Sequence, residues 1–167
     1  MKATKSKELS YHKLKFPLIY NKKIVQKYGD ARVYRDAVLL TPGTWTDAVS
    51  MSPIEYTSEE LQKSAKVWES NYLNIDHSWK TLDRIGYVRD TYFSNNSVKG
   101  DLYIYPITQN SKDAIALIDA GLINALSVEL YSRDVWSNKS ESRLATDITF
   151  CGLAVVTDPA CKDARIK

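Results

Sequence analysis

Apolar residues recur along the chain in short stretches separated by turn-forming residues, a pattern more typical of strands than of long helices. Seven stretches stand out, at residues 16–25, 32–40, 72–77, 86–93, 98–106, 123–131 and 148–156. Asn95 and Asn96 separate two of them and favour a tight turn. The stretches on either side of these asparagines are therefore predicted to pair as a hairpin.

Two other segments have the features of helices. Thr57 and Glu60 form a capping box, in which the two side chains satisfy backbone N–H groups of the first turn. Four apolar residues follow at helical spacing: Leu61, Ala65, Trp68 and Tyr72. The second helix is predicted to run from a cap at Asn110 or Ser111 to Gly121, because glycine is favoured just after the last turn.

About seven strands and two helices define the predicted fold class. Because several strands follow one another directly, we predict a mostly β, α+β fold, an antiparallel β-barrel with helices packed outside it. Residues 134–143 are polar and are predicted to form a surface loop. The length of 167 residues suits one domain, assigned to residues 16–167, and residues 1–15 are predicted to be a flexible basic arm with five lysines.

Composition and charge narrow the function classes. The chain is 44% hydrophobic and 26% charged, as ordinary globular proteins are, and its net charge is only +3. Much of the excess charge lies in the basic arm, so no specific nucleic-acid binding is predicted. Neither a signal peptide nor an apolar run of about 18 residues is present, which predicts a cytosolic protein without membrane association. Cys151 and Cys161 lack metal-ligand spacing, so neither a metal site nor a cofactor is predicted.

Histidine supplies the first candidate for chemistry. The chain has two histidines, and His12 lies in the poorly patterned arm. His77 follows an apolar strand, where a side chain can face a cleft while the sheet holds its backbone. Taken alone, a histidine after an aspartate at a strand end is more often a surface or capping residue.

Ser127 is the second candidate. A period of two puts Leu126 and Val128 on one face of a strand and Ser127 and Glu129 on the other. The hydroxyl therefore lies on a polar face of a strand that is otherwise built for burial. A serine hydroxyl becomes a nucleophile when a neighbouring base such as imidazole accepts its proton, although a serine on a wet strand face needs no such role.

Four short motifs in sequence order add a family resemblance. They are Ile75-Asp-His77, Ile85-Gly-Tyr-Val88, the segment from Gly121 to Val128 and the segment from Leu153 to Ala160. Their order and spacing resemble the caudovirus prohead serine proteases, which belong with the herpesvirus assemblins. The likeness covers residues 70–166 and rests on the combination, because each motif alone is common. It implies an assemblin-like fold, with His77 as general base and Ser127 as nucleophile.

The same resemblance implies a function and partners. Members of this family are serine endopeptidases that cleave scaffold and capsid protein segments during prohead maturation. The implied substrates are therefore capsid and scaffold proteins, and the implied location is the assembling prohead in the host cytoplasm. Relatives of the assemblin type often work as dimers, so a homodimer is the analogous assembly.

The third catalytic residue is left open by the resemblance. Herpesvirus assemblins use a second histidine, but the other histidine of this chain is His12, far from the matching segment. An acidic side chain is the favoured orienter of the imidazole, as in other serine hydrolases. Asp147 is the first choice because it begins the last strand pattern, followed by Asp158 and then Glu129. Asp76 is disfavoured because neighbours on a strand point to opposite faces.

One departure from the family pattern supports an alternative. Many relatives carry a glutamate in the segment that matches residues 150–153, and this chain has none there. A catalytically inactive capsid-assembly or scaffold-binding domain on the same fold is therefore the alternative function. A cysteine hydrolase that pairs Cys151 with His77 is disfavoured, because Cys151 lies in an apolar run where a buried, inert thiol is expected.

Overall fold

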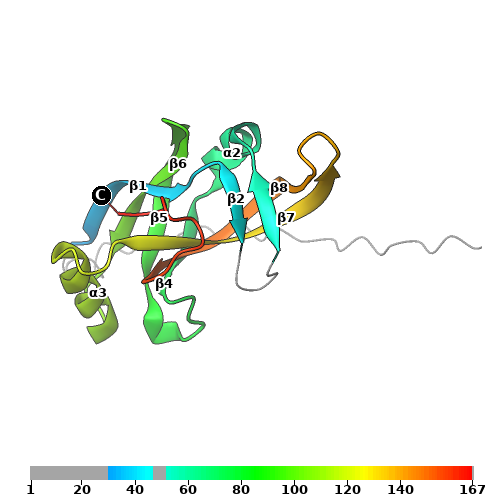
Figure 1. Ribbon diagram of the computed structural model, residues 1–167. Coiled ribbons are helices and arrows are strands. Elements are labelled where there is room, and N and C mark those ends of the chain that lie inside the picture. The colour runs from blue at the N-terminus through cyan, green and yellow to red at the C-terminus, as the bar shows by residue number, and fades with distance from the viewer. Residues whose placement is uncertain (1–29, 47–51, 167) are drawn as a thin grey trace, which may run out of the picture.

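The computed structural model describes residues 30–46 and 52–166. Its elements in chain order are β1 (Arg32–Leu40), β2 (Gly43–Thr46), β3 (Pro53–Tyr56), α2 (Ser58–Ser64), the 3-10 helix η1 (Ala65–Val67), β4 (Ser70–Ile75), the 3-10 helix η2 (Thr81–Asp83), β5 (Arg84–Ser94), β6 (Ser97–Ile104), α3 (Gln109–Asp119), β7 (Ala125–Ser137) and β8 (Ser142–Val156) (Figure 1). No helix within these ranges is long and apolar enough to cross a membrane. The predicted arm, the predicted strand at residues 16–25 and His12 lie outside the described residues.

The strands form one sheet in the order β1-β6-β5-β4-β8-β3-β2, and β7 pairs with the other edge of β8. Among the described strands, four pairs of consecutive strands are antiparallel, β2 with β3, β4 with β5, β5 with β6 and β7 with β8, and the pairing of β5 with β6 is the predicted hairpin. The sheet is nevertheless mixed and not the predicted antiparallel one, because β8 pairs parallel with both β3 and β4. Long stretches of chain separate β8 from these two strands, and such crossovers allow parallel pairing.

The sheet does not close into the predicted barrel. No ladder joins β1 to β7 in the described chain; instead, isolated bridges link Arg165 to Val38 on one side and to Ala125 on the other. A short C-terminal segment therefore occupies the gap between the two strands. The mostly β, α+β class is confirmed, whereas the architecture is an open mixed sheet.

The core lies between the inner face of the sheet and α2. Leu61, Ala65 and Trp68 are fully buried, and the Trp68 ring stacks on Phe150 with centroids 5.2 Å apart. The Thr57 hydroxyl accepts a hydrogen bond from the backbone N–H of Glu60, which confirms the Thr57 half of the predicted capping box, whereas the Glu60 carboxylate pairs with Lys63. The predicted helical stripe does not reach Tyr72, because the chain turns after η1 and enters β4, whose two edges pair with β5 and β8.

Three boundaries predicted from turn-forming and capping residues can be compared with the structure. Asn95 and Asn96 have φ values of 50° and 53° and connect β5 to β6, as the hairpin prediction requires. Gly121 follows α3 with a φ of 70°. The N-cap of α3 is Thr108, not the predicted residue 110 or 111; Ser111 is instead the other half of its capping box.

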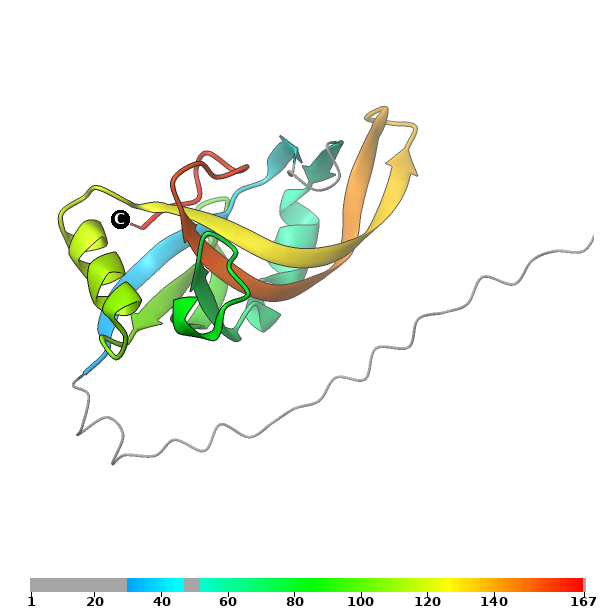
Figure 2. The ribbon, with the colours of Figure 1, turned by 90° about the horizontal axis from the view of Figure 1, so that it is seen from below.

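The predicted surface loop at residues 134–143 is instead the outer end of a β-ribbon, with a turn at residues 138–141. β7 continues to Ser137 and β8 starts at Ser142, with Asp134 opposite Ala145. Figures 1 and 2 show β7 and β8 curving together beyond the rest of the sheet. Hydrogen bonds between the two backbones define such a ribbon, so it forms without an alternating apolar pattern, and Val135 and Trp136 lie exposed on it.

Candidate active site

A tight turn places His77 over the sheet. The N–H of Ser78 donates to the carbonyl oxygen of Ile75 at 2.9 Å, which closes a turn directly after β4. Its central residues, Asp76 and His77, have φ values of 48° and 55°. Positive φ at both central positions is the mark of a type I′ turn, which reverses the chain sharply. The imidazole therefore does not continue along the strand but folds back.

Two further contacts hold this turn. The Tyr72 hydroxyl donates to the carbonyl oxygen of Ser78 at 3.0 Å, which ties the turn to β4. The Ser78 hydroxyl donates to Asp83 on η2. The left-handed backbone is thus fixed from both sides, as strained backbone at functional sites usually is.

The His77 imidazole contacts the Glu129 carboxylate. His77 Nδ1 lies 2.9 Å from Glu129 Oε1, and the side chains are 43% and 18% exposed. An ionised carboxylate can only accept, so Nδ1 is the donor, and in the neutral imidazole Nε2 then carries the lone pair. A carboxylate that holds the imidazole in this tautomer is the arrangement that a general base requires.

Glu129 and Ser127 share one face of β7. They are two residues apart, opposite Gly152 and Ala154 of β8, and their side chains stand about 7 Å apart along the strand. Leu126, which precedes Ser127, is fully buried on the opposite face of β7. The structure thus brings His77 onto the face of β7 that carries the Ser127 hydroxyl.

The other two acids considered as orienters have different partners. Asp147 lies 2.9 Å from Arg133 and 3.7 Å from Lys63, and it is 56% exposed. Asp158 is 86% exposed and pairs with Lys162. Of the three acids, Glu129 is therefore the one in contact with the imidazole. The signal in the sequence was its spacing from Ser127, since residues two apart on a strand face the same way.

Comparisons with known proteins give a fold relationship. No protein-family model matches the sequence, and neither does any curated protein. The fold resembles that of the bacteriophage T4 capsid assembly protease, gp21. The two chains are 10% identical with a TM-score of 0.50, and the match covers 77% of this chain and 98% of that one. At this identity the likeness to gp21 concerns the fold, and the site rests on its own geometry.

Gly152 makes room for the carboxylate on this gp21-like sheet. A Cβ atom at this position would lie 3.0 Å from Glu129 Oε2 and 2.6 Å from Tyr72 Cδ1. Both distances are too short for a side chain to be accommodated without displacing a neighbour. The absence of a side chain at Gly152 is therefore part of how Glu129 reaches His77.

Cys151 is poorly suited to act as a nucleophile. Partial desolvation raises the pKa of its thiol, and the nearby charge of Glu129 raises it further. The protonated thiol is thus favoured, whereas the thiolate is the reactive form. Among residues 30–46 and 52–166, no cluster of three or more His, Cys, Asp and Glu side chains could hold a metal ion.

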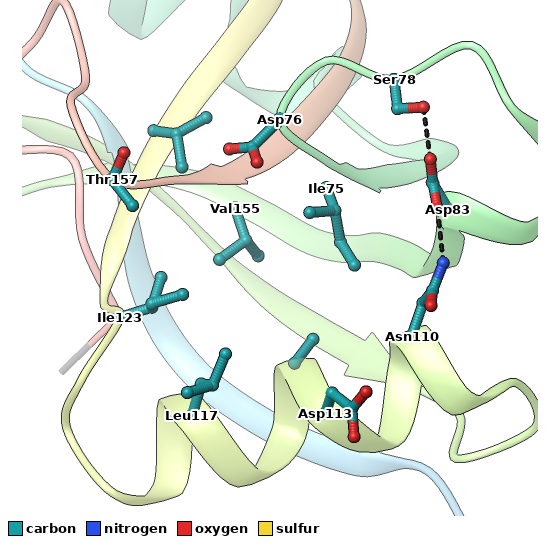
Figure 3. Close-up of a pocket in the computed structure, with 12 residues that line it drawn as sticks. Ile75, Asp76, Ser78, Asp83, Asn110, Asp113, Leu117, Ile123, Val155 and Thr157 are labelled. Carbon is teal, nitrogen blue, oxygen red and sulfur yellow. Dashed lines mark hydrogen bonds between the residues drawn. The ribbon is translucent and has the colours of Figure 1, made fainter.

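A cavity of about 320 Å³ lies beside the turn that carries His77. It separates the turn from α3, and Figure 3 shows Asp76 and Ser78 on its upper side and Leu117 below them. Aliphatic side chains form much of its wall: Ile75, Leu117, Ile123 and Val155. Asp83 accepts hydrogen bonds from Ser78 and Asn110, and the bond from Ser78 is the main cause of its lowered pKa.

Proposed function

We propose that this protein is a serine endopeptidase that cleaves capsid and scaffold protein segments during phage prohead maturation, inside the prohead in the host cytoplasm. The observation that carries the proposal is the contact between His77 Nδ1 and Glu129 Oε1 on the Ser127 face of β7. The similarity in fold to the T4 capsid assembly protease supports the choice of substrates.

Glu129 takes the role that the sequence pattern assigned first to Asp147. Its carboxylate accepts a hydrogen bond from the Nδ1–H group of His77 and stabilises the imidazolium that forms when Nε2 takes up a proton. Asp147 serves instead as the partner of Arg133 and Lys63.

The reaction is acyl transfer to Ser127. His77 Nε2 accepts the hydroxyl proton while Oγ forms a bond to the scissile carbonyl carbon. The imidazolium then protonates the leaving amine as the C–N bond breaks, which leaves an acyl-enzyme. Water attacks this ester with His77 again as base, and the proton returns to Ser127 as the acid product leaves.

The cavity beside the turn receives a substrate side chain. Two of its lining residues, Asp76 and Ser78, flank His77 in sequence, so a side chain bound there lies next to the general base. Its aliphatic wall suits the apolar part of such a side chain.

Co-expression with the cognate capsid and scaffold proteins tests the proposal. We expect wild-type protein to produce cleaved bands and Ser127→Ala to leave both proteins full-length. Ser132→Ala is the matched control, since Ser132 lies on the same strand and its hydroxyl bonds to Asp134. A fluorophosphonate probe is expected to label the wild type and Ser132→Ala but not Ser127→Ala.

Two outcomes would contradict the proposal. Identical bands from wild type and Ser127→Ala would exclude Ser127 as the nucleophile. Uncut proteins together with no probe labelling of the wild type would favour an inactive assembly domain on the same fold.

A further inference from the structure

Asn74 is a buried polar residue in the sheet beneath His77. It lies on β4 opposite Ala154, and Ala154 lies opposite Ser127 on the next strand. Asn74, Ala154 and Ser127 thus form one row across three strands. Asn74 has no exposed surface, although amides are seldom fully buried.

The amide is oriented by Glu129. Asn74 Nδ2 donates to Glu129 Oε1 at 2.8 Å, and the same oxygen accepts a hydrogen bond from His77 Nδ1. Because the carboxylate has no proton to donate, the amide nitrogen must face it. The carbonyl oxygen, Asn74 Oδ1, is then left buried without a hydrogen-bond partner.

An unpartnered buried oxygen is uncommon and calls for an explanation. In the described part of the chain, the one other buried side-chain nitrogen or oxygen without a partner is Thr91 Oγ1. For Asn74 the explanation lies at the opposite end of the amide, where the hydrogen bond to a carboxylate is charge-assisted and strong. Asn74 therefore donates a hydrogen bond to Glu129, while its own carbonyl oxygen has no hydrogen-bond donor.

We propose that Asn74 is a positioning residue for the Glu129 and His77 pair, an inference that rests on the proposed protease function. The amide holds Oε1 at the place where His77 Nδ1 meets it. Asn74 is shielded from solvent, so it acts on catalysis through Glu129 and not on substrate binding.

Other groups around Glu129 cannot replace this hydrogen bond. On β8, the Cys151 thiol has a raised pKa and remains uncharged, and Gly152 offers no side chain. On β4, the Tyr72 hydroxyl donates to Ser78, and the Arg84 guanidinium of β5 stacks on the Tyr72 ring at 4.4 Å. The imidazole and the Asn74 amide are therefore the side chains that fix Oε1.

The first test is Asn74→Leu, which keeps the number and branching of the side-chain heavy atoms and replaces both polar atoms with methyl groups. In the purified full chain, with a peptide spanning a cognate cleavage site, we expect kcat to fall about 10-fold or more, as for other residues that orient a functional side chain. KM should change by less than about 2-fold because ground-state binding is untouched. The acidic limb of the kcat profile should move to lower pH, because a misplaced carboxylate stabilises the imidazolium less.

The matched control is Thr91→Val, which removes the other unpartnered buried oxygen, on β5. We expect unchanged kcat, and both variants should melt within about 4 °C of the wild type. Combining Asn74→Leu with Glu129→Gln should give the kcat of Glu129→Gln alone, since Asn74 acts through that carboxylate. Unchanged kcat and pH profile in Asn74→Leu, or losses in the double variant that multiply, would overturn the proposal.

A readout that does not depend on cleavage separates this inference from the proposed function. The chain has two histidines, so a His12→Gln background leaves the His77 imidazole as a single set of NMR signals. We expect the Nδ1-protonated tautomer in this background and a larger share of the Nε2-protonated tautomer after Asn74→Leu. Unaltered tautomer populations would refute the positioning role, whereas full cleavage by Ser127→Ala would refute only the protease.

Discussion

At the scale of single residues, the site depends on an unusual backbone. Asp76 and His77 both adopt left-handed φ values, which aspartate tolerates better than histidine. Such a turn persists because its surroundings hold it, here through the Tyr72 hydroxyl and the Ser78 side chain. The position of the imidazole is thus set by residues that perform no chemistry.

Tyr72→Phe tests this dependence. It removes the hydrogen bond to the Ser78 carbonyl oxygen, and we expect kcat to fall several-fold while stability falls by about 1 kcal/mol. Kinetic assays with a cognate peptide and denaturant titration measure both. Tyr105→Phe, which removes a hydroxyl bonded to Tyr87, is the control and should keep wild-type kcat. Equal kcat in the two variants would argue against a role for the Tyr72 hydroxyl.

Gly152→Ala tests the room left for Glu129. The new methyl group would displace Tyr72 or the carboxylate, so we expect a stability loss of about 1–3 kcal/mol and a larger loss of kcat per folded molecule. Gly100→Ala is a matched control, since a Cβ there meets Thr91 and Val88 at 2.9 and 3.2 Å, on a different part of the sheet. It should lower stability and leave the kcat of the folded fraction unchanged. A similar kcat loss in both variants would contradict a local role for Gly152.

At the scale of elements, an acidic side chain of α3 ties the helix to β1. The Tyr34 hydroxyl donates to Asp119 at 2.9 Å, and Arg32 pairs with the same carboxylate at 3.0 Å. Burial, followed by the bond to Asp119, raises the pKa of Tyr34 to about 12 from an ordinary value of 10.0. The folded state therefore holds this proton more tightly than the unfolded state does.

This shift predicts an alkaline loss of stability. The contribution of Tyr34 is complete below pH 10.0 and is lost as the pH rises to about 12. We expect the melting temperature of the wild type to fall more steeply across this interval than that of Tyr34→Phe, which has no proton to lose. Thermal melts at closely spaced pH values would show the difference, and parallel curves would rule out the linkage.

Local sequence patterns were sufficient to predict some helix and strand boundaries but not others. Thr57, Gly121 and the Asn95-Asn96 pair mark boundaries through their own hydrogen bonds or dihedrals, so sequence alone located them. β2 and β3 were missed because each has only four residues, and the outer end of the ribbon was predicted as a loop because backbone pairing there produces no alternation of apolar and polar residues. Such strands are defined by partners distant in sequence.

At the scale of the whole molecule, the residues of the site come from strands that meet only in the folded sheet. His77 and Ser127 were chosen as candidates from the sequence by residue type and motif order. Glu129 ranked third among the acids because nothing in the sequence shows that the turn at residues 75–78 reverses the chain. The parallel pairing of β4 with β8, which aligns Asn74 with Ser127, was likewise hidden, since no local pattern encodes register between remote strands.

The segment that fills the gap between β1 and β7 offers a test at this scale. The Arg165 backbone donates to and accepts from Val38, both at 2.9 Å, while Leu126 donates to Ala164 at 3.0 Å. Arg165→Pro removes the donor, so we expect a loss of about 1–3 kcal/mol in the free energy of unfolding. Arg165→Ala keeps the N–H and should stay within about 0.5 kcal/mol of the wild type. Equal stability of the two variants in urea titrations would show that the bridge is unimportant.

This bridge also governs when a nascent chain can complete its structure. Val38 emerges from the ribosome early, but its backbone hydrogen bonds to Arg165 cannot form until that residue has been synthesised. The backbone N–H of Leu126, next to Ser127, likewise has no partner until Ala164 has been synthesised. Contacts between such remote residues form slowly and late. During translation, β7 therefore lacks one of its backbone neighbours until Ala164 has left the ribosome, so the strand that carries Ser127 is among the last parts of the sheet to be completed.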